Sequence, residues 1–170
     1  MQAFETIYKR ASGFVYNLAF RITYNAADAQ EVTQDVFLKV YHNLKRFRFQ
    51  SSFKTWVYRI ATNAALDALK RRRRSSGREI EYDDNIESAA SVDPDEAFEK
   101  AAKQDLVGRL LTRLNPDQRS CVILRDIEGL SYREIAQTLK LNLNTVRSRL
   151  KRARDTLIAL RKKGAIKYEL

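Results

Sequence analysis

The stretch 130–154 constrains the fold more than any other part of this sequence, because it has the pattern of two short helices joined by a tight turn. Ser131 followed by Glu134 three residues later is the signature of a capping box at a helix N-terminus. The apolar residues that come next recur at helical spacing, at Ile135, Ala136 and Leu139. We therefore predict that a helix begins at Ser131 and buries one face.

The second helix of this pair follows a turn over 140–144, and either Asn142 or Asn144 can cap it. Its apolar stripe consists of Val146, Leu150, Ala153 and Leu157. At roughly 100° per residue, a polar and basic surface lies opposite this stripe. The residues that we take as candidate DNA contacts are Asn144, Thr145, Arg147, Ser148, Arg149, Lys151, Arg152 and Arg154.

Such a helix has the properties that a DNA major groove accepts. Arginine can donate two hydrogen bonds to guanine, while flanking cations contact phosphates. The helix-turn-helix is a common device for presenting a helix in this way. An ordinary helical hairpin with a solvated basic face remains the structural alternative.

The composition of the whole chain favours a helical protein with a polyanionic partner. The 170 residues include only 5 Gly and 2 Pro, 44% are hydrophobic, and the net charge is +11. A low Gly and Pro content argues against a turn-rich β-protein, and a strongly basic chain suits nucleic acid. The chain has room for one ordinary domain or two small ones.

Several function classes have little support. No stretch approaches the roughly 20 apolar residues of a membrane span, and the first ten residues lack a signal-peptide pattern. There is one His (His42), one Cys (Cys121), no Gly-rich phosphate loop and no metal-ligand motif. We expect a cytoplasmic protein without enzymatic activity, cofactor, metal or small-molecule substrate. His42 is expected to be solvated and Cys121 to lie in the core.

The N-terminal half predicts three amphipathic helices, over about 2–23, 27–44 and 53–74. The second helix carries an unusual acidic and amide-rich face in a chain that is otherwise basic. This face would repel DNA, so it is either a solvated surface or a docking face for a basic protein.

Cations alternate with aromatic residues between the second and third helices, from Lys45 to Phe53. We interpret this short segment as a loop whose rings can stack on unpaired bases; packing of Phe47 and Phe53 against helices is an equally good interpretation. The third helix ends in a run of cations over 70–74, for which a nucleic-acid contact is favoured. Asp67 can pair with Arg71 at i,i+4 spacing.

Two motif blocks together resemble a known family. The first runs Ala29-Gln30-Glu31-Val32-Thr33-Gln34-Asp35-Val36-Phe37-Leu38-Lys39-Val40, then Phe53-Lys54-Thr55-Trp56-Val57-Tyr58-Arg59-Ile60-Ala61-Thr62-Asn63, Asp67 and the arginine run. The second is Gly129-Leu130-Ser131-Tyr132-Arg133-Glu134-Ile135-Ala136 with Thr145-Val146-Arg147-Ser148-Arg149-Leu150. In this order and spacing they resemble the two DNA-binding domains of bacterial RNA polymerase sigma factors of the extracytoplasmic-function (ECF) class.

The resemblance implies a role for each surface. Core RNA polymerase would bind the second helix through Asp28, Glu31, Gln34, Asp35 and Leu38. The upstream promoter element would be read as duplex by the helix-turn-helix. The downstream element would be held as a melted strand by Lys45, Arg46, Phe47, Arg48, Phe49, Ser51, Trp56, Arg59, Asn63, Lys70, Arg71 and Arg74. The implied partners are core polymerase, promoter DNA and an anti-sigma protein.

The predicted fold is all-α, with two small helical domains joined by a flexible acidic linker. We place the domains at 1–75 and 99–163, the linker at 76–98 and a tail at 164–170. The segment 79–99 carries many carboxylates and no Lys or Arg, which is typical of a linker. Within the helix-turn-helix, the family usually has Gly, Pro and Gly where this chain has Lys140, Asn142 and Asn144. We expect the turn to form with a small cost in backbone strain.

Two other function classes remain open at this point. A polymerase-independent repressor or activator would use the same helix-turn-helix but would not need the acidic face or the aromatic loop. An interaction module that mimics a sigma factor in a signalling cascade would leave the basic face of Arg147 and Lys151 unused.

Overall fold

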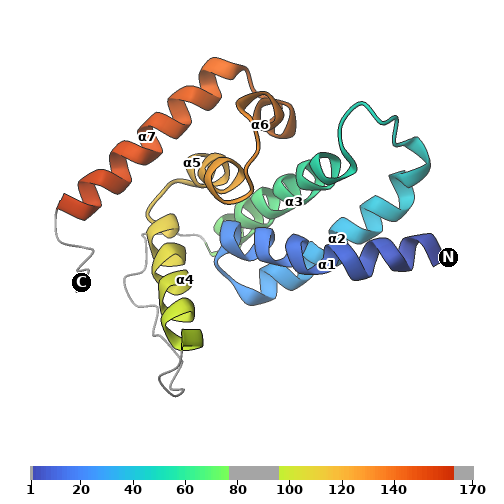
Figure 1. Ribbon diagram of the computed structural model, residues 1–170, viewed down its shortest axis with the longest axis horizontal. Coiled ribbons are helices and arrows are strands. Elements are labelled where there is room, and N and C mark those ends of the chain that lie inside the picture. The colour runs from blue at the N-terminus through green and yellow to red at the C-terminus, as the bar shows by residue number, and fades with distance from the viewer. Residues whose placement is uncertain (1, 77–95, 163–170) are drawn as a thin grey trace.

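A computed structural model describes residues 2–76 and 96–162 of the chain, and all of its regular elements are helical over these two ranges (Figure 1). The N-terminal half consists of α1 (Gln2–Thr23), α2 (Ala26–Asn43), the short 3₁₀ helix η1 (Leu44–Arg46) and α3 (Phe53–Ser76). The C-terminal half consists of α4 (Glu96–Thr112), α5 (Pro116–Val122), the π-helical turn η2 (Ile123–Ile127), α6 (Tyr132–Leu139) and α7 (Leu143–Lys162). The predicted all-α class is confirmed.

Helices α1, α2 and α3 pack against one another through the apolar stripes that their sequences predict. Each helix contributes a row of fully buried side chains at three- and four-residue spacing: Val15, Leu18 and Ile22 from α1, Val32, Val36 and Val40 from α2, and Val57, Ala61 and Ala65 from α3. The start of α2 is fixed by Asn25, whose side chain accepts a hydrogen bond from the Asp28 backbone N–H at 2.9 Å. The helix bounds differ from the predicted ones by at most two residues.

The cap residues of the C-terminal half behave largely as the sequence indicates. Asn115 caps α5, with Pro116 in the first turn. Gly129 adopts a φ of 75°, which ends the helical path after η2. Ser131 and Glu134 form the complete capping box at the start of α6.

The turn between α6 and α7 contains the strain that its unusual residues predict. Lys140 lies in the left-handed region, with a φ of 53°, at the C-terminus of α6. Of the two candidate caps for α7, Asn142 accepts a hydrogen bond from the Thr145 backbone N–H at 2.8 Å. Asn144 instead accepts a long contact from Arg147 at 3.4 Å. The helix-turn-helix is therefore formed by α6 and α7, with Asn142 as its cap.

One predicted ion pair is wrong. Asp67 was expected to pair with Arg71, but its carboxylate lies 3.6 Å from Lys70 Nζ. Arg71 instead pairs with Glu31 of α2, at 3.0 Å. The reason is tertiary: α2 packs beside α3 and offers Arg71 a carboxylate that sequence spacing along one helix does not reveal.

The two halves of the chain lie against each other, with α3 between α1 and α2 on one side and α5 and α6 on the other (Figure 1). Their buried apolar side chains form one continuous cluster. Arg119 of α5 is buried and donates to four backbone carbonyls, those of Ile22, Leu111, Thr112 and Leu114, at 2.7–3.2 Å. The bond to Ile22 joins the halves directly.

The ends of the chain and the middle of the predicted linker are outside the described residues. The structure assigns Ser76 to α3 and starts α4 at Glu96, so most of the predicted linker 76–98 and the predicted tail 164–170 fall in ranges that are not described. Cys121 is fully buried, and burial raises the pKa of its thiol to about 11. His42 is exposed, as expected.

Candidate nucleic-acid and polymerase interfaces

The predicted upstream-element residues lie together along the open face of α7. The inward stripe of this helix is buried, at Val146, Leu150 and Ala153. On the opposite face Arg147, Ser148, Lys151 and Arg152 are all exposed. Because an α-helix repeats every 3.6 residues, these four side chains form a continuous basic surface.

Two of the flanking arginines on α7 have a structural partner. Arg149 pairs with Asp117 at 2.9 Å and Arg154 pairs with Asp126 at 3.0 Å. Both partners belong to the segment α5–η2, so these ion pairs fix α7 against its own half of the chain. Exposed pairs of this kind contribute little to stability, and a phosphate can compete for either arginine.

An aromatic cluster forms at the loop between η1 and α3. The ring of Trp56 lies 5.1 Å from that of Phe47, and Phe47 lies 4.7 Å from Phe49. Phe49 is 85% exposed and has a φ of 54°, so the loop presents this ring to solvent in a strained conformation. Phe53 packs on both Phe47 and Trp56. Phe47 and Phe53 therefore pack against neighbouring rings, as one interpretation of the loop expects, whereas stacking of Phe49 on a base stays a prediction.

Two cavities flank Trp56. The first, which we call the outer cavity, has a volume of about 400 Å³ and is lined by Lys39, Asn43, Arg46, Trp56, Ile60, Asn63, Ala64 and Asp67. The second, which we call the loop cavity, has a volume of about 360 Å³ and is lined by Arg46, Phe47, Arg48, Gln50, Ser51, Trp56, Arg59 and Gln137. The Nε atom of Arg59 is buried and has no hydrogen-bond partner in the described part of the chain.

The structure brings together most of the predicted downstream-element residues, but not all of them. Lys45 and Arg46 are exposed in η1, and Asn63 lines the outer cavity. Lys70, Arg71 and Arg74 lie further along α3. At 1.5 Å per residue, Arg71 is about 18 Å from Arg59 along the helix axis, so Arg71 and Arg74 lie away from the loop cavity. Lys70 adjoins the outer cavity, because it pairs with Asp67 in the lining of that cavity.

Sequence reasoning missed several residues that line these cavities. Asn43 and Gln50 are polar and lie near predicted residues in the sequence, which is only a weak indication that they belong to the site. Gln137 is different, because it comes from α6 of the other half. No local sequence pattern indicates that it lies beside the loop.

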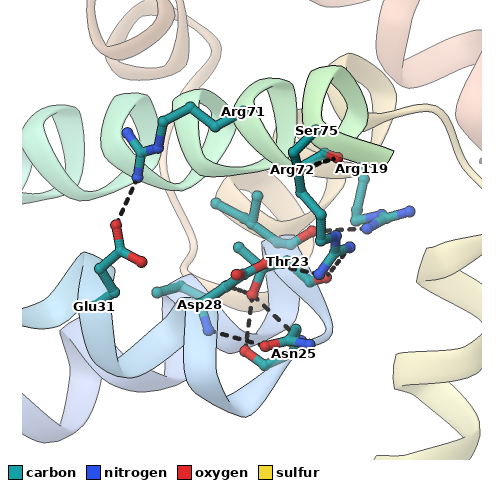
Figure 2. A network of polar contacts seen from close by, with 10 residues as sticks. Thr23, Asn25, Asp28, Glu31, Arg71, Arg72, Ser75 and Arg119 are labelled. Carbon is teal, nitrogen blue, oxygen red and sulfur yellow. Dashed lines mark hydrogen bonds and ion pairs between the residues drawn. The ribbon is translucent and has the colours of Figure 1, made fainter. Parts of the chain in front are cut away.

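The predicted polymerase-binding face of α2 is partly engaged within the chain (Figure 2). Arg72 of α3 donates to Asp28 at 2.6 Å and to the Thr23 carbonyl at 3.2 Å. Figure 2 also shows Arg71 reaching Glu31 at the edge of the same network. Two acidic residues of α2 are therefore tied to the basic end of α3.

The other members of this face have no such contact. Gln34 is exposed, and Leu38 is 59% exposed. Asp35 is half-buried and makes no ion pair with any residue in 2–76 or 96–162. A partner protein would therefore meet Gln34, Asp35 and Leu38 first.

Comparison with known proteins identifies the family. The Sigma-70 region 2 family matches residues 7–75, and the Sigma-70 region 4 family matches residues 104–157. The RNA polymerase sigma-H factor of Pseudomonas aeruginosa is 35% identical over 166 residues, which cover 92% of this chain and 84% of the relative. The ECF RNA polymerase sigma-E factor of Escherichia coli is 37% identical over 139 residues, covering 78% and 73%. The chain belongs to the ECF sigma factors.

Further comparisons agree with this assignment. The ECF RNA polymerase sigma factor SigE of Mycolicibacterium smegmatis is 34% identical over 157 residues; the match covers 92% of this sigma factor but 61% of that relative. The sigma factor RpoE of Bartonella quintana, solved with the anti-sigma factor NepR, has the same fold, with a TM-score of 0.73 at 23% identity over 95% of this chain and 98% of that one. CnrH, solved with the cytosolic domain of CnrY, matches with a TM-score of 0.68 at 25% identity, over 95% of this chain and 89% of that one.

These matches bear on one of the function classes that the sequence left open, the polymerase-independent regulator. The two matched regions coincide with the two halves of the fold, and the relatives are named as RNA polymerase sigma factors. A polymerase-independent regulator is therefore not favoured. Sigma factors are transcription initiation factors rather than enzymes. Within 2–76 and 96–162, this one has no helix long and apolar enough to cross a membrane.

Proposed function

We propose that this sigma factor directs core RNA polymerase to promoters through two separate DNA surfaces. The exposed face of α7 reads the upstream element as duplex, and the loop between η1 and α3 holds the downstream element as a melted strand. The observation that carries this proposal is the division of chemistry between the halves. One half offers an open basic helix, and the other offers an exposed aromatic ring beside cavities lined by arginines.

The upstream surface suits base readout in a major groove. Arg147 lies near the N-terminus of α7, with Ser148 beside it and Lys151 one turn further on, and all three are exposed. In helix-turn-helix proteins the N-terminal part of the second helix contacts base edges. We assign base contact to Arg147 and phosphate contacts to Lys151 and Arg152, with Asn144, Thr145, Arg149 and Arg154 at the margins.

The downstream surface suits a strand that has left the duplex. Unpairing and unstacking cost a few kcal/mol per base, and each base stacked on an aromatic ring returns about 1–3 kcal/mol. Phe49 alone cannot offset the melting of several bases, so phosphate contacts from the loop cations and binding to the polymerase are also required. The free protein is accordingly expected to bind promoter DNA weakly.

Core polymerase binds the acidic face of α2 in this proposal. Gln34, Asp35 and Leu38 make the first contact, since Asp28 and Glu31 are held by Arg72 and Arg71. A basic partner can also bind these two carboxylates, if its own cations replace Arg72 and Arg71 in the ion pairs. For regulation, we propose control by an anti-sigma protein, which is supported by the structure of the sigma factor RpoE of Bartonella quintana in complex with the anti-sigma factor NepR.

The upstream assignment is tested with the core polymerase complex of this protein bound to promoter DNA. Replacing Arg147 by Ala lowers affinity for the upstream element by about 1–3 kcal/mol if this residue reads a base. Arg161→Ala is the matched control, because Arg161 is exposed in the last turn of the same helix. An equal loss for Arg147→Ala on scrambled DNA would reduce its role to a phosphate contact.

A further inference from the structure

Two asparagines lie at the start of α7, and only one of them holds the end of the helix. Asn142 precedes the helix, and its side chain accepts a hydrogen bond from the Thr145 backbone N–H at 2.8 Å, as an N-cap does. Asn144 lies exposed in the first turn, and its hydrogen bond joins it to the side chain of Arg147. Asparagine is a poor helix former, because its side chain competes for backbone groups. Neither capping nor helix propensity therefore explains the asparagine at position 144.

Asn144 stands at the N-terminal end of the basic surface of α7. Residues three, four and seven positions further on lie on the same side of an α-helix, and here they are Arg147, Ser148 and Lys151. All four side chains are exposed, and the buried stripe of α7 lies on the opposite side. In helix-turn-helix proteins the N-terminal residues of the second helix contact base edges. When α7 lies in a major groove, Asn144 is therefore among the residues nearest to the bases.

The contact between Asn144 and Arg147 leaves both side chains able to bind a base. Arg147 Nη1 donates to Asn144 Oδ1 at 3.4 Å, which is long for a hydrogen bond. A guanidinium has five N–H donors, and an amide has two N–H donors and an oxygen that accepts twice. Arg147 can therefore still donate to two acceptors of one base. Asn144 can still donate from Nδ2 and accept at Oδ1.

The groups that remain on Asn144 match the major-groove edge of adenine. Adenine presents an acceptor, N7, beside a donor, the N6 amino group, whereas guanine presents two acceptors. An amide can bind both groups of adenine at once, and a guanidinium can bind both acceptors of guanine. Asn144 and Arg147 are about 4.5 Å apart along the helix axis. This separation is close to the spacing of roughly 3.4 Å between successive bases of one strand, so the two side chains reach neighbouring base pairs.

We propose that Asn144 is a specificity-determining residue of the upstream surface, which reads an adenine in the base pair next to the guanine bound by Arg147. This proposal rests on the proposed function, because it requires α7 to lie in the major groove of the upstream element. It gives a base contact to a residue at the margin of that surface. The amide carries no charge, so it adds sequence preference without adding to the attraction for phosphates.

The experiment is a selection from promoter duplexes that are randomised over the upstream element. The full-length protein in complex with core polymerase is incubated with the pool, and the bound duplexes are sequenced. The unmodified protein should select a guanine with an adenine in the adjacent base pair. For Asn144→Ala, we expect the preference for that adenine to fall about tenfold, as for loss of a bidentate contact, while the preference for the guanine remains. Arg147→Ala should have the reverse effect.

Asn142→Ala is the matched control, because it removes the same kind of side chain two residues away. It should lower the urea midpoint of unfolding, since it removes the N-cap, and leave the relative preference among bases unchanged. Asn144→Ala should not lower that midpoint, because alanine is the better helix former. The two substitutions thus separate helix stability from base reading.

A second variant tests the chemistry of the contact. Asn144→Asp keeps the size of the side chain but replaces the Nδ2 donor by an acceptor. Aspartate is favoured in the first turn of a helix, so α7 is retained. A carboxylate accepts a hydrogen bond from the N4 amino group of cytosine. The preferred base at this position should therefore change from adenine to cytosine, while the overall affinity falls because the new charge repels phosphates.

Three results would overturn the proposal. The first is an unchanged preference for adenine in Asn144→Ala. The second is a loss at the guanine bound by Arg147 instead, which would make Asn144 only a support for that side chain. The third is retention of adenine by Asn144→Asp. Failure of the proposed function looks different: if the unmodified protein selects no base at any position of the upstream element, α7 makes phosphate contacts only, and this proposal falls with it.

Discussion

Replacing Arg119 by Met should destabilise this protein more than any other single change to a charged side chain discussed above. Arg119 is 6% exposed, and its guanidinium donates to four backbone carbonyls. The carbonyls of Leu111 and Thr112 belong to the last turn of α4, where unpaired oxygens and the negative end of the helix dipole both favour a cation. Methionine keeps the apolar stem but leaves these oxygens unpaired.

The magnitude follows from these contacts. A hydrogen bond to a charged group is worth about 1.5–3 kcal/mol, but four bonds from one guanidinium are not additive, and its removal also relieves the cost of burying a charge. We therefore expect a loss of about 3–5 kcal/mol in the free energy of unfolding. At about 2–4 °C per kcal/mol for a chain of this size, the melting temperature should fall by roughly 10 °C.

The assay is urea and thermal unfolding followed by circular dichroism, with Arg109→Met as the control. Arg109 is half-exposed and pairs with Asp105 at i,i+4 spacing, so its loss should cost at most about 0.5 kcal/mol. The bond from Arg119 to Ile22 crosses between the halves, so the variant should also unfold less cooperatively. If Arg119→Met costs no more than Arg109→Met, the reasoning on buried carbonyls is refuted.

Three further predictions concern single residues. Lys140→Gly should raise the free energy of unfolding by about 0.5–1 kcal/mol, because glycine accepts the φ of 53° without strain. The control Lys151→Gly, in mid-helix, should lower it by about 1 kcal/mol. If Lys140→Gly lowers the free energy of unfolding as much as Lys151→Gly does, strain at this turn is excluded. The Ser131 backbone N–H lowers the pKa of Glu134, so the ionised carboxylate stabilises the fold at neutral pH, and this contribution is lost as pH falls through the folded pKa. Glu134→Gln should therefore lose less stability on acidification than the unmodified protein, as followed by urea midpoints, and parallel losses would contradict this. Phe49→Ala should weaken binding of single-stranded DNA by about 1–3 kcal/mol and leave duplex binding unchanged. Tyr41 is an exposed aromatic residue on α2, and Tyr41→Ala should change neither affinity. If the two substitutions have equal effects, Phe49 is not part of the strand site.

Local structure was predictable because its causes are local. The apolar spacing of α1 and the caps at Asn115 and Ser131 depend on residues within one or two turns, so the helices and their starts follow from sequence. Backbone strain at the α6–α7 turn was also expected, because Lys140 stands where the family usually has Gly. The choice of Asn142 over Asn144 as cap required coordinates, because both residue types fit.

The contacts that the sequence did not indicate join residues far apart in the chain. Glu128 meets Tyr58 and Arg21, and Gln137 meets the loop, only because the two halves pack against each other. Nothing in the neighbourhood of a surface carboxylate distinguishes one that bridges two helices, such as Glu128, from one that pairs nearby, such as Asp126. The predicted pairing of Asp67 with Arg71 was wrong for the same reason, because Arg71 pairs with Glu31 on another helix, α2.

The most direct test of the account is run-off transcription with purified core RNA polymerase on genomic fragments, with and without this protein. We predict discrete new start sites that depend on the protein and disappear with Asp35→Arg. This substitution reverses charge on the proposed docking face and breaks no ion pair made by Asp28 or Glu31. Tight duplex binding by the free protein, with no protein-dependent transcripts, would contradict the account.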